Sequence, residues 1–167
     1  VGNYRRQISG ADQSADFFHA TNTDAMAARQ EAAQQAMVAL KEFISGGNEI
    51  GRVGIFDATN TTKKRRKWIM KELKDVVHSK SHVVFVEIIC TDESVIENNI
   101  RAVKTSMPDY KGKNENDAVA DFRQRIDNYN SVYETIKDDS LSFIKLFDEG
   151  KKMTANNIRG SLQSKCC

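Results

Sequence analysis

One stretch of the sequence combines an acid, a hydroxyl-rich turn and a dense run of cations. Asp57 ends the apolar segment 51–57, the turn Thr59-Asn60-Thr61-Thr62 follows, and lysines and arginines fill positions 63–67. We expect a strand over Gly51–Asp57 and a helix from about Thr62 to His78. The cations would then occupy the first helical turn, which already carries the positive end of the helix dipole, so a bound phosphate there would remove the conflict. Asp57 is a candidate ligand for the Mg²⁺ ion that accompanies transferable phosphates.

The overall composition restricts the partners that this basic run could serve. The 167 residues carry a net charge of +2, with 40% hydrophobic and 29% charged residues, which is ordinary for one globular domain. A net charge this small argues against nucleic acid or a membrane surface as a bulk partner. A solvated charge run or a localisation-type basic patch stays open for positions 63–67. Apolar runs of about 18 residues, which would span a membrane, do not occur.

The cysteines and histidines indicate neither a disulfide framework nor a zinc site. Cys90, Cys166 and Cys167 form no CxxC pair, and we expect no secretory leader, which together favour the reducing cytoplasm. The three histidines, at positions 19, 78 and 82, are too few and too scattered to bind zinc convincingly.

Helices and strands are expected to alternate along the rest of the chain. A loop over 1–21 leads into a long helix, about Asn22–Ile44, with Thr21 and Asp24 as a capping pair and Gly46-Gly47 as its end. Further helices are expected over about Glu93–Thr105, Glu115–Ile136 and Thr154–Ser164, and further strands over His82–Cys90 and Leu141–Phe147. Near-continuous apolar strands between helices predict an α/β fold with a doubly wound, mainly parallel sheet.

The ends of the predicted strands carry candidate site residues. Ligands of doubly wound sheets bind at the carboxyl ends of the strands, where Asp57, Cys90 and Asp148 lie in this prediction. The chain opens with Val1–Arg6, which reads as a strand end running into a loop, and three strands are few for such a sheet. We therefore expect that N-terminal strands of the fold are missing from this chain.

Several polar side chains fall on or beside the apolar faces of the predicted helices. Arg29 lies in the inward stripe of the first helix, Arg65 stands one turn before the inward face of the basic helix, and Asn99 lies within the next one. Arg125 and Tyr129 flank the inward face of the late helix. The stripe of the first helix consists of Met26, Ala33, Met37, Leu40 and Ile44. Singly, each polar residue is more readily structural, but three inward arginines need something to offset their desolvation, and a phosphate held by guanidinium groups would do so.

The same residues belong to motifs that cover nearly the whole chain in order. These are Val1-Gly-Asn-Tyr-Arg-Arg6, Asp16-Phe-Phe18, Ala25-Met-Ala-Ala-Arg29, Phe56-Asp-Ala-Thr-Asn-Thr-Thr62 with Arg65-Arg66, Val103-Lys104 leading into Pro108-Asp-Tyr110, and Phe122-Arg-Gln-Arg-Ile126 with Tyr129 and Tyr133. By these motifs the chain resembles the kinase domain of 6-phosphofructo-2-kinase/fructose-2,6-bisphosphatase. The resemblance implies a P-loop nucleotide-kinase fold and transfer of the γ-phosphoryl group of Mg-ATP to the 2-hydroxyl of fructose 6-phosphate, a reaction that regulates glycolysis.

Carried onto this sequence residue by residue, the resemblance implies particular roles. The fructose 6-phosphate site would consist of Arg5, Arg29, Thr59, Arg65, Lys104, Arg125 and Tyr129. Asp57 would be the acid beside Mg²⁺ and the attacking hydroxyl, and Lys104 would face the transferring phosphate. The nucleotide side would be lined by Asn99, Ile100, Arg101, Ala102, Val103 and Lys104. Cys90 matches an active-site cysteine of the family, although a small buried side chain at a strand end explains it equally well.

The resemblance also implies what single substitutions should do. Alanine in place of Arg65 or Arg125 is expected to weaken sugar-phosphate binding by the size of a charge-assisted contact, roughly 1.5–3 kcal/mol. The same substitutions are expected to leave stability nearly unchanged.

The sequence departs from the family in lacking a P-loop. No G-x-x-x-x-G-K-[ST] motif occurs, and no histidine follows His82, so the bisphosphatase motifs are not found either. We therefore expect residues 1–167 to be a single, incomplete kinase domain that binds ATP poorly and turns over little alone, in a parent that is a cytoplasmic 6-phosphofructo-2-kinase. The alternative is a non-catalytic sugar-phosphate-binding domain that has lost the P-loop. A homodimer is compatible with both readings, and the sequence does not decide the oligomeric state.

Overall fold

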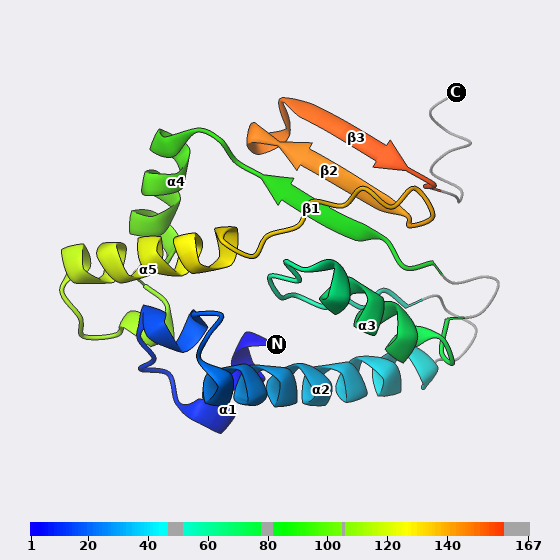
Figure 1. The fold of residues 1–167 in the computed structure, drawn as a ribbon, viewed down its shortest axis with the longest axis horizontal. Coiled ribbons are helices and arrows are strands. Elements are labelled where there is room, and N and C mark those ends of the chain that lie inside the picture. Colours follow the sequence, from blue (N-terminus) through cyan, green and yellow to red (C-terminus); the bar gives the residue numbers. More distant parts are fainter. Residues whose placement is uncertain (47–51, 78–81, 105, 159–167) are drawn as a thin grey trace.

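The computed structural model describes residues 1–46, 52–77, 82–104 and 106–158, in which helices pack beside a small sheet (Figure 1). The helices are α1 (Gly2–Ser9), α2 (Thr23–Ser45), α3 (Lys63–Leu73), α4 (Glu93–Asn99) and α5 (Glu115–Asn130), and the strands are β1 (Phe85–Ile89), β2 (Phe143–Phe147) and β3 (Lys152–Asn156). Short 3₁₀ segments are η1 (Ala15–Phe18), η3 (Pro108–Tyr110) and η4 (Asp148–Gly150), and the π-helical segment η2 (Ile100–Lys104) directly follows α4. Within these residues every helix is too short or too polar to cross a membrane.

The sheet has the order β1-β2-β3 and is mixed. β1 and β2 run parallel, whereas β2 and β3 run antiparallel. The predicted α/β class is therefore confirmed, and the segments 82–90 and 141–147 do pair in parallel, but the described sheet is mixed and not mainly parallel. The carboxyl ends of this pair meet as expected, because Asp148 accepts a hydrogen bond from the backbone N–H of Thr91 at 2.7 Å. The doubly wound arrangement stays a prediction, since the described sheet has only three strands.

The predicted last helix is wrong over its described part. Residues 152–156 form β3, because the chain reverses directly after β2 through Asp148, Glu149 and Gly150, whose φ angles are 45°, 59° and 91°. This left-handed turn returns the chain along the free edge of β2, where its backbone groups find hydrogen-bond partners. The predicted features that lie outside the described residues are Gly47, His78, Cys166, Cys167 and the stretch 159–164 of the last helix.

The predicted strand that ends at Asp57 is also wrong. Residues 52–57 follow an extended path but pair with no strand in the described part of the chain, and Gly51 lies outside that part. Val53 and Ile55 are 84% and 83% exposed. The alternating apolar pattern is present, but a strand also needs a neighbouring backbone with which to pair, and the pattern alone cannot provide one.

The helix starts follow local capping groups. α2 begins after Asn22, whose side chain accepts a hydrogen bond from the backbone of the first turn, so the predicted capping pair of Thr21 and Asp24 is wrong. α2 ends at Ser45, and Gly46 follows as its C-cap, as the predicted stop at this glycine requires. Thr62 caps α3 in the same way as Asn22 caps α2, so the basic run does begin a helix, as its position after the hydroxyl-rich turn predicts.

Other helical regions differ from the prediction in extent. The expected N-terminal loop contains α1 and η1, the expected helix over 93–105 divides into α4 and η2, and α3 ends at Leu73 instead of His78. α5 ends at Asn130 instead of Ile136. After α5 the chain turns toward the start of α3, where the backbone N–H of Glu134 donates to the carbonyl oxygen of Thr61 at 3.0 Å. This distant contact, which local propensity cannot reveal, ends α5 early.

The core lies between α2, α3 and the inner face of the sheet. Met37, Ile69 and Leu73 form its buried centre, and Phe85 of β1 packs against them. The predicted stripe of α2 is partly wrong, because Met26 is exposed while four alanines, at positions 25, 32, 33 and 36, are buried. These small side chains line the contact face of α2, on which α1 packs.

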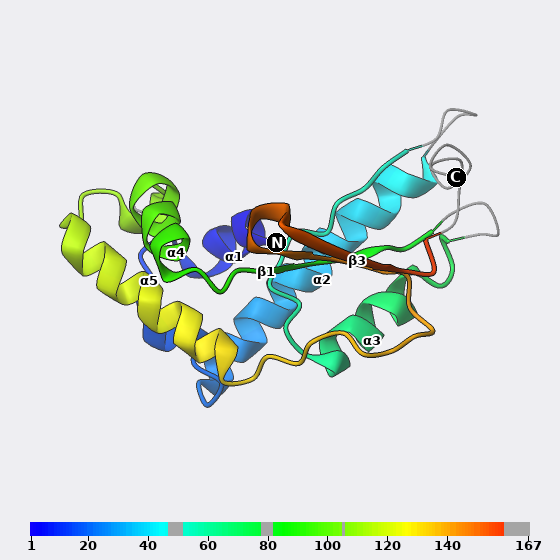
Figure 2. The ribbon, with the colours of Figure 1, turned by 90° about the horizontal axis from the view of Figure 1, so that it is seen from above.

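The outer face of the sheet is apolar and exposed. Successive strand residues point to opposite sides, so Ile88 faces away from the helices while Glu87 faces them. Figure 2 shows α3 on one side of the sheet. On the outer side, Ile88, Leu146 and Met153 stand in register across the three strands, and Ile88 and Met153 are 75% and 65% exposed.

Candidate anion-binding cavity

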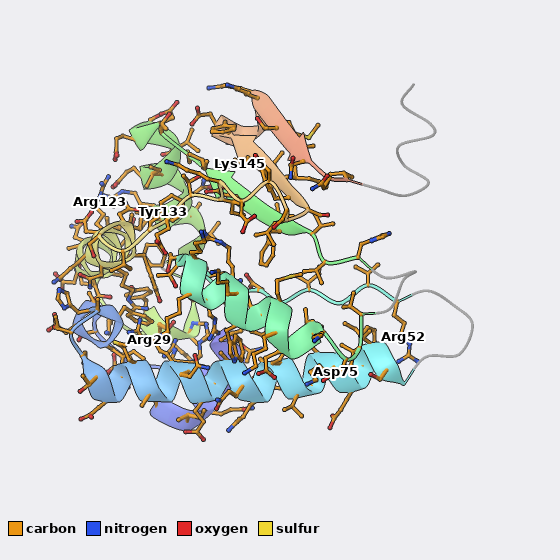
Figure 3. The ribbon with its side chains drawn as sticks, turned by 45° about the vertical axis from the view of Figure 1, so that its right-hand side comes forward. Arg29, Arg52, Asp75, Arg123, Tyr133 and Lys145 are labelled. Atoms are coloured by element: carbon orange, nitrogen blue, oxygen red, sulfur yellow. The ribbon has the colours of Figure 1, made fainter. Side chains whose placement is uncertain are left out.

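A cavity of about 1050 Å³ opens between α1, α2, α3, α5 and the turn at 58–62. Its lining includes six cations, Arg5, Arg6, Arg29, Lys64, Arg65 and Arg125, and among the described lining residues a single carboxylate, Asp109. Arg29 lies on the side of α2 that faces α5 (Figure 3). This excess of positive charge in a concave site favours an anionic ligand.

Most of the residues that the family resemblance assigns to the sugar phosphate meet at this cavity. Six of them line it: Arg5, Arg29, Thr59, Arg65, Arg125 and Tyr129. The seventh is Lys104, whose backbone ends η2 and whose side chain lies outside the described part of the structure. The structure thus gathers groups from four separate helices and one turn, while the role of each stays a prediction.

Two of the cavity arginines are already paired with carboxylates of the protein. Arg5 is buried and places its Nη2 atom 2.6 Å from Oδ1 of Asp109. Arg125 is also buried, with its Nε 2.9 Å from Oδ2 of Asp121 and its Nη1 3.7 Å from Oδ2 of Asp109. A further arginine, Arg6, lies 3.4 Å from the same Asp109 carboxylate. Much of the desolvation cost of Arg5 and Arg125 is therefore offset from within the protein.

Aromatic rings complete the surroundings of Arg125. Its guanidinium lies between the rings of Phe18 and Tyr110, with centroids 4.4 Å and 4.8 Å away. The Tyr110 hydroxyl donates to Asp121 at 2.7 Å, and burial together with this hydrogen bond raises the pKa of Tyr110. Burial alone would raise the pKa of Asp121, but hydrogen bonds from Tyr110 and from the backbone of Ala15, with the nearby charge of Arg125, hold it below its usual value.

Arg29 and Arg65 differ from this pair because neither has an ionic partner. Within the described residues no carboxylate lies within 4.0 Å of either guanidinium. Arg29 donates to the backbone carbonyl oxygens of Ala25, Phe18 and His19 at 3.2, 3.3 and 3.5 Å. Such uncompensated cations at a cavity wall are suited to bind a phosphate.

Arg65 is held by neutral groups. Its Nη1 donates to Oε1 of Gln30 at 2.7 Å, and its guanidinium lies 4.3 Å from the ring centroid of Trp68. Burial lowers the pKa of Arg65, which is the direction expected for a cation that has left water without gaining an anion.

The start of α3 is partly neutralised by the protein itself. The backbone N–H of Lys63 donates to Oε2 of Glu134 at 2.6 Å, so a carboxylate occupies part of the position for which the sequence predicts a phosphate. The basic run also divides. Lys63, Lys64 and Lys67 are exposed, whereas Arg65 turns toward the cavity and Arg66 is buried, donating to the backbone carbonyl oxygens of residues 60, 61 and 134.

The remaining predicted site residues do not line this cavity. Asp57 is exposed and immediately precedes the lining turn, which begins at Ala58. Cys90 follows β1, where its thiol donates to the carbonyl oxygen of Asp92 at 3.8 Å. The segment 99–103 lies at the end of α4 and in η2, with only Ile100 buried. The structure therefore brings together six of the seven residues assigned to the sugar phosphate, and the roles of these six and of Asp57, Cys90 and the segment 99–103 stay predictions.

Several lining residues escaped the prediction from sequence. Asp109 belongs to the Pro-Asp-Tyr motif, but its pairing with Arg5 joins positions 104 residues apart, so no local signal reveals it. Trp68 lies on the basic helix and Gln30 directly follows Arg29, and neither residue type indicates a place in the cavity wall. No spacing of residues along the sequence indicates that an arginine will bond to a neutral acceptor.

The described residues do not fit a complete nucleotide site. Asp57 is a carboxylate of the kind that Mg²⁺ binds, but groups of three or more metal-binding side chains are absent from the described part of the chain. Arg101 is the one cation of the segment 99–103, and its guanidinium already lies 2.8 Å from Glu97 and 3.0 Å from Glu115. A cation paired with two carboxylates is poorly suited to the phosphates of ATP.

Comparisons with known proteins agree on one family. The family model described as 6-phosphofructo-2-kinase matches residues 1–167. A 6-phosphofructo-2-kinase/fructose-2,6-bisphosphatase from Gallus gallus is 42% identical over 168 residues, covering 99% of this chain and 35% of that protein. From Saccharomyces cerevisiae, 6-phosphofructo-2-kinase 1 is 41% identical (98% of this chain, 20% of that protein), and a fructose-2,6-bisphosphatase is 39% identical (99% and 36%). The chain thus spans between a fifth and somewhat more than a third of these relatives.

Proposed function

Because the chain belongs to the 6-phosphofructo-2-kinase family, we propose that its cavity binds fructose 6-phosphate for transfer of the ATP γ-phosphoryl group to the 2-hydroxyl, giving fructose 2,6-bisphosphate. The observation that carries the proposal is the charge balance of the cavity, in which six cations face one carboxylate. A sugar phosphate supplies both the anion that these cations lack and hydroxyl groups for the polar side chains of the wall.

The roles within the proposed site follow from the contacts of each residue. Arg29 and Arg65, which have no carboxylate within ion-pairing distance in the described structure, are assigned to the phosphate group. Thr59 and Tyr129 carry hydroxyls on the wall and are assigned to the sugar. Arg5 and Arg125 also line the cavity, where their pairing with Asp109 and Asp121 assigns them to holding its wall in place. Phosphoryl transfer depends mainly on such positioning and charge neutralisation, with little need for a strong base.

The nucleotide half of the reaction is assigned by family membership only. When bound, ATP supplies the phosphoryl group and Mg²⁺ neutralises the charge that develops on it. Asp57 as the acid beside the metal, Lys104 at the transferring phosphate, the segment 99–104 along the nucleotide and Cys90 in the active site remain proposals. Since the described donor set does not fit the phosphates of ATP, we expect the 167-residue chain alone to show little turnover.

The test of the sugar-phosphate site is calorimetric titration of the chain with fructose 6-phosphate. Arg65→Ala should weaken binding by roughly 1.5–3 kcal/mol, the size of a charge-assisted contact. Lys67→Ala is the matched control, because Lys67 is an exposed cation on the same helix outside the cavity lining. Equal losses for the two variants would show that only net charge matters and would contradict the site, as would absence of binding to the unaltered chain.

The second candidate is a sugar-phosphate-binding domain without kinase activity. It is favoured by the poor fit of the described residues to a nucleotide, and a yeast relative named fructose-2,6-bisphosphatase carries a matching stretch. Measuring both fructose 6-phosphate affinity and fructose 2,6-bisphosphate formation in the longest natural form of the protein separates the candidates. Binding with product formation supports the kinase, and binding without it supports the non-catalytic domain.

A further inference from the structure

The contact between Gln30 and Arg65 joins two helices at the cavity wall. Gln30 comes from the second turn of α2 and Arg65 from the first turn of α3, and both line the cavity. Oε1 of Gln30 accepts a hydrogen bond of 2.7 Å from Nη1 of Arg65, and the guanidinium of Arg65 lies 4.3 Å from the ring centroid of Trp68. These two contacts restrict the orientation of a long side chain that would otherwise sample many rotamers.

The chemistry of the acceptor distinguishes Arg65 from Arg5 and Arg125. Arg5 and Arg125 are oriented by the carboxylates of Asp109 and Asp121, which also neutralise them. Like a carboxylate, an amide oxygen accepts a hydrogen bond from a guanidinium and so orients it, but the amide carries no net charge. The cation of Arg65 therefore stays available to a ligand, in a half-buried place where water screens it less than at the open surface.

We propose that Gln30 is a positioning residue that orients Arg65 for a phosphomonoester while leaving its charge uncompensated. The inference rests on the proposed function, because it deepens the description of the same site. It assigns the selectivity for an anion to the neutrality of position 30, and not to the number of arginines alone. Replacing the amide by a carboxylate should keep the hydrogen bond and remove the function.

Three variants of the full 167-residue chain test this inference. Gln30→Glu keeps an acceptor on a side chain of the same length and adds a negative charge beside Arg65. Gln30→Met keeps the length and the helix propensity but removes the acceptor. Gln34→Glu is the matched control, since Gln34 is exposed on the same helix and lies outside the cavity lining. Each is titrated calorimetrically with fructose 6-phosphate, and its melting temperature is recorded.

The order of the affinities decides the outcome. Gln30→Glu should raise the Kd at least roughly tenfold, the effect of losing one charge-assisted contact, with a melting temperature that is unchanged or higher. Gln30→Met should raise the Kd by less, and Gln34→Glu should leave it within about twofold of the unaltered chain. A residue that merely supported the fold would give the reverse order, because Gln30→Met loses the hydrogen bond and Gln30→Glu keeps it.

The failures of the two proposals are distinguishable. If the unaltered chain binds fructose 6-phosphate and Gln30→Glu binds it equally well, or better than Gln30→Met does, the inference about Gln30 is overturned and the proposed site stands. If the unaltered chain does not bind fructose 6-phosphate, the proposed function fails and the role of Gln30 fails with it.

Discussion

Arg65 and Arg125 have the same side chain and the same predicted role, but their contacts indicate different roles in the folded chain. Arg125 is buried between two rings and bonded to carboxylates from η3 and α5. Arg65 has a neutral acceptor and one face of an indole. For Arg65, the expectation that alanine leaves the stability nearly unchanged stays a prediction. For Arg125, these contacts lead us to expect a loss of stability.

Arg125→Ala should destabilise the fold. The substitution leaves Asp121 without its ionic partner and removes the group that fills the space between Phe18 and Tyr110. Removing one member of a buried pair typically costs several kcal/mol, and the partners that Asp109 retains reduce this to about 2–4 kcal/mol. Urea unfolding followed by circular dichroism measures the change.

Arg123→Ala is the control for that measurement. Arg123 lies two residues earlier on α5 and pairs with Glu93 and Glu97, but at the surface, where ion pairs contribute little. If Arg123→Ala and Arg125→Ala lower the free energy of unfolding by similar amounts, burial of the Arg125 network contributes nothing to stability. Arg125 would then serve ligand binding alone, as the sequence predicts.

At the scale of elements, a buried carboxylate ties the segment after α5 to the sheet. Glu87 of β1 accepts hydrogen bonds from the Tyr133 hydroxyl and from the backbone N–H of Ile136, and lies 3.1 Å from Nζ of Lys145 on β2. Burial alone would raise the pKa of Glu87, but these hydrogen bonds outweigh it and hold the pKa below its usual value. Burial and the bond to Glu87 raise the pKa of Tyr133 to about 12.

Glu87→Gln should flatten the loss of stability in acid. Because the pKa of Glu87 is lower in the folded chain than in the unfolded one, ionised Glu87 stabilises the fold above a pH of about 4.3, and this contribution disappears as the pH falls through the folded pKa. The free energy of unfolding of the glutamine variant should therefore fall less steeply below about pH 4.5. Urea titrations at several pH values measure the slope, and an unchanged slope would show that Glu87 does not couple protonation to folding.

The elements also show what local sequence patterns can and cannot predict. The positions of α2, β1 and β2 were predictable because apolar runs and helix-ending residues are local signals, although the predicted N-terminal cap of α2 was wrong and its apolar stripe partly wrong. β3 was not, because three successive left-handed residues, 148–150, decide that the chain returns along β2. The extended segment 52–57 has a strand pattern without a strand, since pairing depends on a second segment.

The candidate site shows the same difference between what local sequence signals predict and what distant contacts decide. Helical spacing predicts that Arg29, Arg65 and Arg125 lie on or near the inward faces of their helices, and the family resemblance predicts that they meet at one site, as they do at the cavity. Their partners could not, because Gln30 lies 35 residues from Arg65, and Asp109 lies 104 residues from Arg5. Which arginine remains uncompensated is a property of these distant contacts, and it decides which one can bind an anion.

At the scale of the whole molecule, the outer face of the sheet exposes a row of apolar side chains. Ile88, Leu146 and Met153 stand in one row across all three strands, and Val86 is exposed beside them. Contiguous apolar patches of this kind are uncommon on monomeric proteins and bind apolar ligands or other surfaces.

Ile88→Lys should reduce the fluorescence of the dye anilinonaphthalene sulfonate in the presence of the chain. Ile88 is 75% exposed, so the lysine ammonium can remain in water and the melting temperature should change little. Val38→Lys is the matched control, because Val38 is an exposed apolar residue of α2 away from the sheet. A decrease of the same size for both variants would argue that the dye binds general apolar surface and not the sheet face.

The neighbourhood of Arg65 also has an optical consequence. Trp68 is the only tryptophan of the chain, it lines the cavity, and the guanidinium of Arg65 lies over its ring. The tryptophan emission of the chain therefore originates at the wall of the cavity, beside the cation that we assign to the phosphate group. The fluorescence of Trp68 is therefore an intrinsic, label-free reporter of ligand binding at the cavity.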